Sequence, residues 1–293
     1  MLKKISIVGG GEIGGAVSYI ASGAGVGHSV WDKDPAKSAA LSPEECFAGT
    51  EAVFFCIPSW AIRSALNDLS AKIPGNIPLV FVSKGLEKGT GLTAAEVAAQ
   101  FVGKERIVFM GGPMIAEEVI TGKGGHAVLG GGGISAVPLA EMFKGNNVSA
   151  ETAEDAFSVA ILGVLKNIYA LLMGAAEKME VGENVRAYLF AKSLEEMSLV
   201  SGRLGGKVSA MNPAGIGDLL ATGMSRGSSN RKAGFEFAGG TVPAKASEGM
   251  ASVSEVVARL GGAVPPLPLM SFVLSMVNNG SVNKEDWNRI LNG

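Results

Sequence analysis

Lys166 and Asn167 lie at the centre of a long apolar run, Phe157 to Ala176, and are the first candidates for chemistry. An apolar helix of this length should be buried all round, and burying an amine far from a helix end is costly unless the amine is needed there. A buried amine with a lowered pKa can accept and return a proton, so we interpret Lys166 as catalytic. The alternatives are a snorkelling surface lysine and a membrane span, which the Lys-Asn pair disfavours.

Further candidates follow predicted buried strands. Lys84 comes after the strand that starts at Leu79, while Pro58 and Gly112 to Ala116 follow two other strands. Ligands of doubly wound sheets bind beyond the carboxyl ends of the strands, so all of these are site candidates. Asp218 lies among glycines at the start of a short apolar helix. The alternative for Lys84 is an ordinary loop lysine. The alternative for Asp218 is a helix N-cap.

A glycine-rich turn follows a short β-branched strand at Ile5 to Val8 and precedes a helix-like stretch. In this GxGxxG pattern, Gly9 allows the tight turn, Gly11 lets the backbone approach a pyrophosphate, and Gly14 lets the helix pack against the strand. The sequence therefore predicts a dinucleotide-binding turn that includes Glu12 and Ile13.

Asp32 ends the next predicted strand, His28 to Trp31. A carboxylate there would accept hydrogen bonds from the adenine ribose hydroxyls and would repel a 2′-phosphate. We therefore expect NAD as cofactor, with NADP left open because Lys33 lies beside Asp32. A helix cap or turn role is the alternative for Asp32.

A donor-rich segment extends from Arg226 to Lys232 and contains Ser228, Ser229, Asn230 and Arg231. Its hydroxyl, amide and guanidinium groups are what a phosphate pocket requires. A solvated basic turn is the commoner meaning of such a run.

The composition bounds the class of protein and its partners. A length of 293 residues predicts about two domains, and 47% hydrophobic against 18% charged residues allows large cores. A net charge of −2 and a pI near 5.8 give no global field for nucleic acid or an anionic membrane, so we expect a small-molecule partner.

The cysteines and histidines do not predict a metal site. Cys46 and Cys56 form no CxxC motif, and only His28 and His126 could join them, so we expect no metal and no disulfide framework. Reduced thiols favour a cytoplasmic location.

The order of the elements predicts an α/β protein. Predicted strands give way to predicted helices after Asn147, close to a boundary at 153/154. We expect an N-terminal Rossmann domain with a doubly wound parallel sheet over residues 1–153, and an all-α substrate and catalytic domain over residues 154–293. Expected helices include residues 184–203, 247–260 and 269–277.

The ordered motifs resemble one family over nearly the whole chain. The motifs are GGGEIG, FCIPS, SKGLE at Ser83, GP at Gly112 with AEE at Ala116, LKN at Leu165, AGIGD ending at Asp218, NR at Asn230 and SEG at Ser247. Together they are similar to the NAD(P)-dependent sn-glycerol-3-phosphate dehydrogenases. The resemblance implies a Rossmann domain, a helical domain of the 6-phosphogluconate dehydrogenase type, and an active site between them.

The resemblance also implies residue roles. Lys166 would be the proton-transfer residue, with Lys84 and Asp218 in the substrate site. Other substrate contacts would come from Gly112, Ser228 and Asn230, with Ser229 and Arg231 beside them in the donor-rich segment. The residues matched to cofactor contacts are Ala116 and Glu248, which join Gly9, Gly11, Gly14, Asp32, Pro58 and Lys84.

The implied reaction is the interconversion of sn-glycerol 3-phosphate and dihydroxyacetone phosphate. Family likeness further suggests a homodimer that supplies glycerol phosphate for lipid synthesis. From the residues themselves we expect a cytoplasmic protein with no membrane span. Two departures bear on phosphate affinity: Met114 stands where many members have serine, and Ser229 where they have arginine. A ketopantoate reductase-like enzyme and a non-catalytic NAD-binding module are the alternatives.

Overall fold

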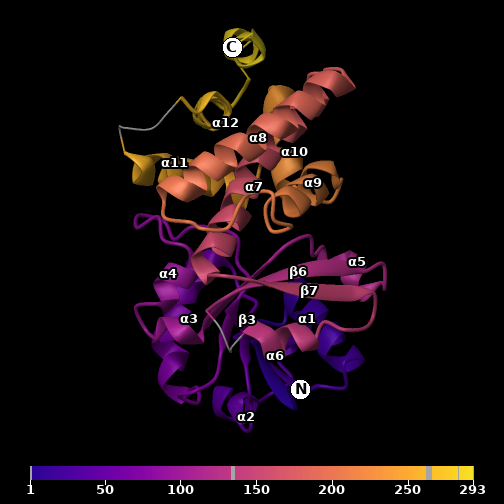
Figure 1. Cartoon of the computed structure of the whole chain (residues 1–293), viewed down its shortest axis with the longest axis vertical. Helices are drawn as coiled ribbons and strands as arrows, with labels where there is room; N and C mark the ends of the chain where they lie inside the picture. Colours follow the sequence, from indigo (N-terminus) through magenta and orange to yellow (C-terminus); the bar gives the residue numbers. More distant parts are fainter. Residues whose placement is uncertain (1, 133–135, 262–265, 283, 293) are drawn as a thin grey trace. The chain divides into compact units, whose positions relative to one another are not determined.

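The structure is a computed structural model that describes residues 2–132, 136–261, 266–282 and 284–292. The chain forms two compact units (Figure 1). Unit 1 comprises Met1–Lys84 and Leu92–Ala160, and unit 2 comprises Gly85–Gly91 and Ile161–Gly293. The segment Gly85–Gly91 therefore belongs with the second half of the chain, although it follows Lys84 directly. The expected boundary at 153/154 remains a prediction.

Unit 1 is built on a seven-stranded sheet in the order β2-β1-β3-β4-β5-β6-β7. Its strands are β1 Lys4–Val8, β2 Gly27–Trp31, β3 Val53–Phe55, β4 Leu79–Phe81, β5 Ile107–Gly111, β6 Gly125–Gly130 and β7 Val148–Ala153. Neighbouring strands are parallel except β5 and β6, which are antiparallel. This one antiparallel pair makes the sheet mixed. Sheets of α/β proteins often carry an antiparallel strand toward one edge.

Helices cover both faces of this sheet, as in a doubly wound fold. They are α1 Glu12–Gly23, α2 Pro43–Phe47, α3 Ile62–Leu69, α4 Ala94–Ala98, α5 Ala116–Ile120 and α6 Ala136–Glu141, with short 3-10 turns η1 Pro35–Lys37, η2 Ser59–Ala61, η3 Ser70–Lys72 and η4 Lys104–Arg106. Helices α1, α5 and α6 share one apolar core with the sheet. Helices α3 and α4 lie on the other face (Figure 1). The Rossmann prediction for the N-terminal half is confirmed.

Strand β7 was missed by the sequence prediction, which ended the strands before Asn147. Its sequence, VSAETA, is polar on both faces, and only Val148 is buried. Such a segment lacks the alternation of apolar and polar residues that predicts a strand. It is a strand because it pairs with β6 along its whole length.

Unit 2 consists of helices. They are α7 Ala156–Lys178, α8 Glu183–Arg203, α9 Ile216–Met224, α10 Ser229–Ala238, α11 Glu248–Leu260, α12 Pro268–Asn279 and α13 Lys284–Asn292, of which the first turn of α7 belongs to unit 1. The predicted helices in this half are confirmed. Helices α10 and α13 were not predicted, because the start of α10 had been interpreted as a donor-rich loop for phosphate and α13 is short and rich in charge.

Helix α7 is the long apolar helix that carries Lys166. By length and composition alone it could cross a membrane, but 83% of its most apolar window is buried inside the protein. A buried core helix meets the same criteria. Asp155 caps its start, because the carboxylate accepts hydrogen bonds from the backbone N–H and the hydroxyl of Ser158, each at 2.7 Å.

Candidate active site

Lys166 is buried in the middle of α7 and faces α9. Its ammonium nitrogen lies 3.0 Å from Oδ1 of Asp218 and donates a hydrogen bond to Oγ1 of Thr222 at 2.7 Å. The snorkelling alternative is therefore wrong, because the amine is turned to a buried carboxylate rather than to water.

Asp218 is a partner of Lys166 and not a helix cap. Gly215 is the N-cap residue of α9, and it makes no side-chain cap hydrogen bond. Asp218 lies in the first turn of α9, where its carboxylate also benefits from the positive end of the helix dipole. It is buried and accepts a hydrogen bond from the Thr222 hydroxyl at 3.3 Å.

Thr222 is a site residue that the sequence interpretation missed. It lies one helical turn after Asp218 on α9, and residues at i and i+4 share a helix face. That spacing was the available signal, since a hydroxyl one turn from a carboxylate can contact the same amine as the carboxylate does.

Asn167, the neighbour of Lys166, anchors a second buried network. Its Nδ2 donates to Oε2 of Glu248 at 3.0 Å, and its Oδ1 accepts from Nδ2 of Asn230 at 2.9 Å. Oδ1 of Asn230 in turn accepts from the backbone N–H of Gly249 at 2.8 Å. Two predicted site residues, Asn230 and Glu248, thus contact Asn167, the residue that follows Lys166 in the chain. A Cβ atom at Gly249 would collide with the carbonyl oxygen of Asn167, so this close approach requires glycine.

The predicted donor-rich turn is in fact the start of α10. Ser228 is its N-cap, and the Ser228 hydroxyl accepts from the N–H of Arg231 at 3.2 Å. Ser229 is the first helical residue and is exposed. The Arg231 guanidinium forms an ion pair with Glu177 on α7, and its side chain is only 12% exposed. The structure therefore turns Arg231 toward α7 instead of leaving it in a solvated loop.

In unit 1, two predicted substrate-site residues meet at the strand ends. The Lys84 ammonium donates to the carbonyl oxygen of Gly112 at 3.1 Å. Lys84 follows β4 and Gly112 follows β5, which are parallel neighbours, so their carboxyl ends share one edge of the sheet.

The glycine turn has the geometry expected of a phosphate-binding loop. Gly9 has φ of +105°, a conformation that favours glycine, and a Cβ atom at Gly14 would collide with the carbonyl oxygen of Gly9. A Cβ atom at Gly11 would meet nothing within 4 Å, so the backbone is open on that side. The carboxylate of Asp32 accepts from the N–H of Gly10 at 2.8 Å and from the N–H of Asp34 at 2.9 Å.

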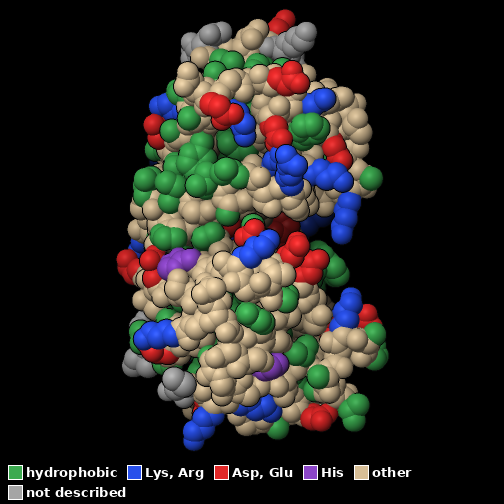
Figure 2. Space-filling view, turned by 90° about the vertical axis from the view of Figure 1, so that its right-hand side faces the viewer, with side chains coloured by type: hydrophobic (Ala, Val, Ile, Leu, Met, Phe, Trp, Pro, Cys, Tyr) green, Lys and Arg blue, Asp and Glu red, His purple; other side chains and the backbone are tan. Residues whose placement is uncertain are grey.

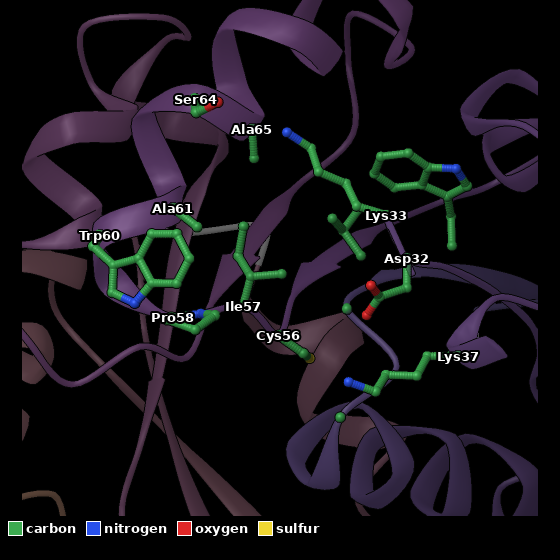
Figure 3. Close-up of a pocket in the computed structure, with 14 residues that line it drawn as sticks. Asp32, Lys33, Lys37, Cys56, Ile57, Pro58, Trp60, Ala61, Ser64 and Ala65 are labelled. Atoms are coloured by element: carbon green, nitrogen blue, oxygen red, sulfur yellow. The ribbon is translucent and has the colours of Figure 1, made fainter. Parts of the chain in front are cut away.

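A cavity of about 450 Å³ adjoins this turn (Figure 3). Its wall includes Gly9, Gly11, Asp32 and Pro58, four of the predicted cofactor residues. Cys56 also lines it, and burial raises the pKa of this thiol to about 12, so the thiol stays protonated.

Six predicted cofactor residues do not line this cavity, namely Glu12, Ile13, Gly14, Lys84, Ala116 and Glu248. Glu12 and Ile13 form the first turn of α1. Ala116 is the first residue of α5 and is buried. Their assigned contacts stay predictions.

In the part of the chain that the structure describes, no group of three or more His, Cys, Asp and Glu side chains could hold a metal ion. The structure combines a glycine turn that follows β1, a carboxylate at the end of β2 that accepts from this turn, and a buried lysine held by a carboxylate and a hydroxyl. A Rossmann domain and a helical domain with these features define a two-domain dinucleotide-dependent oxidoreductase.

Comparison with protein families identifies the family of this oxidoreductase. The NAD-dependent glycerol-3-phosphate dehydrogenase N-terminus matches residues 38–132, and the corresponding C-terminus matches residues 155–286. The chain belongs to this family.

Curated relatives from this family match the chain over most of their own length. The chain is 28% identical over 279 residues to glycerol-3-phosphate dehydrogenase (NAD(P)+) of Clostridium perfringens, covering 87% of this chain and 84% of the relative. It is 29% identical over 256 residues to glycerol-3-phosphate dehydrogenase (NAD(P)+) 1 of Mycobacterium tuberculosis, covering 82% and 73%.

Solved structures show the same fold. The glycerol-3-phosphate dehydrogenase of Coxiella burnetii has a TM-score of 0.86 at 22% identity, covering 100% of this chain and 99% of that one. A ketopantoate reductase of Ralstonia eutropha has a TM-score of 0.57 at 19% identity, covering 94% and 99%. The ketopantoate reductase fold is therefore related but less similar.

Proposed function

We propose that this protein interconverts sn-glycerol 3-phosphate and dihydroxyacetone phosphate by hydride transfer with a nicotinamide dinucleotide. The observation that carries the proposal is the buried Lys166, whose ammonium contacts both Asp218 and Thr222. Membership of the family supports the choice of substrate.

The residues of unit 1 fit a dinucleotide. The open side of Gly11 would admit a pyrophosphate, and the carboxylate of Asp32 would accept the ribose hydroxyls. When bound, the nicotinamide accepts or supplies the hydride. Asp32 would repel a 2′-phosphate, so we propose NAD as the preferred cofactor with NADP as the weaker one.

Lys166 performs the proton transfer. As the C2 hydrogen of glycerol 3-phosphate leaves as hydride and the C–O bond becomes a carbonyl, the hydroxyl proton passes to a neutral Nζ of Lys166. In the reverse direction Nζ returns that proton to the developing alkoxide. Asp218 and Thr222 each contact the nitrogen, so they fix its direction and stabilise its protonated form.

Other predicted residues support binding. The Lys84 ammonium, which the carbonyl oxygen of Gly112 holds at the strand ends, offers its other N–H groups to the substrate. Asn230 and Glu248 hold Asn167, and Ser228 and Ser229 offer hydroxyls at the start of α10. Arg231 acts through its ion pair with Glu177, which fixes α10 to α7.

The setting of the enzyme is also part of the proposal. We infer a cytoplasmic homodimer without a membrane span or a nucleic-acid partner, supplying glycerol phosphate for lipid synthesis. On the face shown in Figure 2, acidic and basic side chains are interspersed, which supports a small-molecule partner. Light scattering on the purified chain tests the dimer, since a mass of one chain at micromolar concentration would rule it out.

The central test replaces Lys166 with alanine and follows NADH oxidation by absorbance. With dihydroxyacetone phosphate, we expect kcat to fall by at least about a hundredfold, the scale of general acid–base catalysis. NADH binding should stay the same. Lys178→Ala is the matched control, because Lys178 is an exposed lysine in the last turn of the same helix.

Two results would reject the proposed reaction. Turnover of the wild type with ketopantoate but not with dihydroxyacetone phosphate would favour the keto-acid alternative. Tight NADH binding with no turnover of either compound would indicate a binding module without catalysis.

A further inference from the structure

The segment Gly85–Gly91 belongs to unit 2, although it directly follows Lys84, the predicted substrate-binding lysine of unit 1. Three of its seven residues are glycines, and two of these, Gly89 and Gly91, have φ of +84° and +63°. A chain of this composition has high conformational freedom, so it keeps one conformation only where other contacts hold it. Whatever holds this loop therefore bears on the position of Lys84.

Helix α11 holds the loop through two charged side chains. The Arg259 guanidinium donates from Nη1 to the carbonyl oxygen of Gly91 at 2.8 Å, in a partly buried position. The Glu255 carboxylate accepts from the N–H of Gly89 at 3.1 Å, in an exposed position. Glu255 and Arg259 lie one helical turn apart, so both side chains meet the loop from the same side of α11.

Arg259 also packs on the loop with its aliphatic stem. A Cβ atom at Gly91 would lie 3.0 Å from Cδ and 3.1 Å from Cγ of Arg259, so a side chain there would displace the stem. The stem thus covers backbone that has no side chain of its own, while the guanidinium bonds the carbonyl oxygen. Arg259 is the stronger of the two contacts, because its hydrogen bond is less exposed to water than that of Glu255.

Contacts within the loop make it compact. The N–H of Gly91 donates to the carbonyl oxygen of Glu87 at 2.9 Å, and the Thr90 hydroxyl donates to the Glu87 carboxylate at 2.6 Å. Leu86 is only 7% exposed and anchors the start of the loop. A loop closed in this way moves as one body, so holding Gly91 also holds its first residues.

Lys84 is thus held from both directions along the chain. On the side of β4, the Ser83 hydroxyl donates to the carbonyl oxygen of Ile57 at 2.6 Å. On the other side the chain continues into the loop that α11 holds. Because the stem of a lysine is long and flexible, a backbone fixed on both sides limits where its ammonium can reach.

We propose that Arg259 and Glu255 are positioning residues, which hold the Gly85–Gly91 loop on α11 and thereby fix the Lys84 ammonium where it meets the substrate. The inference rests on the proposed function in taking Lys84 as a substrate-binding residue. It assigns to two residues of α11 an effect on substrate affinity that needs no contact with the substrate.

Helix α11 then bears on both lysines of the proposed site. Its first residue, Glu248, accepts from the side-chain amide of Asn167, the neighbour of Lys166 in the chain. Its last two turns carry the side chains that hold the loop after Lys84. A helix is rigid, so it keeps these two contacts at a fixed separation.

Two measurements test the proposal, and the first does not depend on turnover. Trypsin cleavage after Lys88, an exposed residue of the loop, is followed by mass spectrometry on the native protein. Arg259→Met removes the guanidinium and keeps an apolar stem, so we expect cleavage at least about tenfold faster than in the wild type. Arg259→Lys keeps a donor and should stay within about threefold. Arg203→Met is the matched control, because Arg203 is an exposed arginine in the last turn of α8.

The second measurement is the kinetics of NADH oxidation with dihydroxyacetone phosphate. We expect Arg259→Met to raise KM about tenfold, with kcat and the Kd for NADH changed less than about twofold, because the loop bears on substrate binding. Glu255→Ala should raise KM less, since its hydrogen bond is exposed. In a Lys84→Ala background, Arg259→Met should lower kcat/KM by less than about twofold further, because residues that act through one group are not additive.

Each measurement can overturn the proposal. Equally fast cleavage after Lys88 in Arg259→Met and the wild type would show that Arg259 does not hold the loop. Faster cleavage with an unchanged KM, or a loss of kcat/KM that adds fully to that of Lys84→Ala, would show that the loop does not position Lys84.

Failure of the proposed function gives a different result. A wild-type protein that reduces ketopantoate and not dihydroxyacetone phosphate has lost only the proposed reaction, and KM is then compared with ketopantoate. A wild type that turns over neither compound rejects the proposed function and the role of Lys84 with it. The cleavage rates alone then decide whether α11 holds the loop.

Discussion

The ammonium nitrogen of Lys166 and the carboxylate of Asp218 lie 3.0 Å apart, with side chains only 8% and 4% exposed. Removing one member of such a buried pair leaves the other charge without compensation, which costs about 3–5 kcal/mol. We therefore expect Asp218→Asn to lower the free energy of unfolding of unit 2 by this amount, measured by urea denaturation.

The same substitution should abolish turnover, since the amine loses the group that directs it. Glu195→Gln is the control, because Glu195 pairs with Lys192 on the surface, where the two side chains are 61% and 42% exposed. We expect that variant to change stability by less than about 1 kcal/mol. Equal effects of the two substitutions would mean that the buried pair has no special role.

Thr222 should matter through its hydroxyl alone. Thr222→Val keeps the shape but removes the group that accepts from Lys166 and donates to Asp218, so we expect kcat to fall by about tenfold or more. Thr222→Ser keeps the hydroxyl and should retain most of kcat. If Thr222→Val and Thr222→Ser lose activity to the same extent, the methyl group rather than the hydroxyl is what the site needs.

The parts of the site that could be predicted from sequence are those with a local pattern. The spacing of its glycines predicts the dinucleotide-binding turn, and a charge within an apolar run indicates Lys166. Asp218 was found for the same reason, as a carboxylate among glycines at a helix start. In each case the residue type is costly at its position unless it has a function.

The missed parts depend on contacts far apart in the sequence. Arg231 pairs with Glu177, more than fifty positions earlier, and the segment predicted as a donor-rich loop is the start of α10. Strand β7 likewise depends on β6, because its own residues carry no two-residue alternation. Local patterns cannot reveal an element that is specified by its partner.

Asp32 should set the choice between NAD and NADP. Asp32→Asn keeps an oxygen that can accept from the Gly10 N–H but removes the negative charge, so the 2′-phosphate of NADPH no longer meets a like charge. We expect the Kd for NADPH relative to that for NADH to fall by at least about tenfold, measured by fluorescence titration. ADP-ribose, which carries the same adenine ribose without the 2′-phosphate, is the control ligand, and its Kd should change by the same factor as that for NADH. An unchanged ratio would show that another residue governs the choice.

Ser229 offers a gain-of-function test of phosphate binding. It is exposed at the first position of α10, next to Asn230, which contacts the neighbour of Lys166. An arginine there can form a two-pronged contact with a phosphate. We expect Ser229→Arg to lower KM for dihydroxyacetone phosphate several-fold, by about 1 kcal/mol of binding, with kcat little changed.

Two comparisons make the Ser229 test specific. Ser229→Lys should give a smaller gain, because an ammonium is a point charge without the planar fork. Dihydroxyacetone itself, which lacks the phosphate, should be used equally poorly by all three proteins. A KM that rises in Ser229→Arg would mean that the start of α10 does not receive the phosphate.

Glu196 makes the stability of unit 2 depend on pH. Burial raises the pKa of this carboxyl above its ordinary value, although the N–H groups of Leu269 and Met270 and the hydroxyl of Tyr169 act in the opposite direction. A carboxyl with a raised folded-state pKa stabilises the fold fully below its unfolded pKa, and this contribution is lost as pH rises through the folded value. The unfolding free energy of the wild type relative to Glu196→Gln should therefore decline as pH rises above the ordinary pKa of a glutamate, measured by urea midpoints. Glu195→Gln, the same change at an exposed neighbour, should show no such decline, and a difference that grows with pH would contradict the assignment.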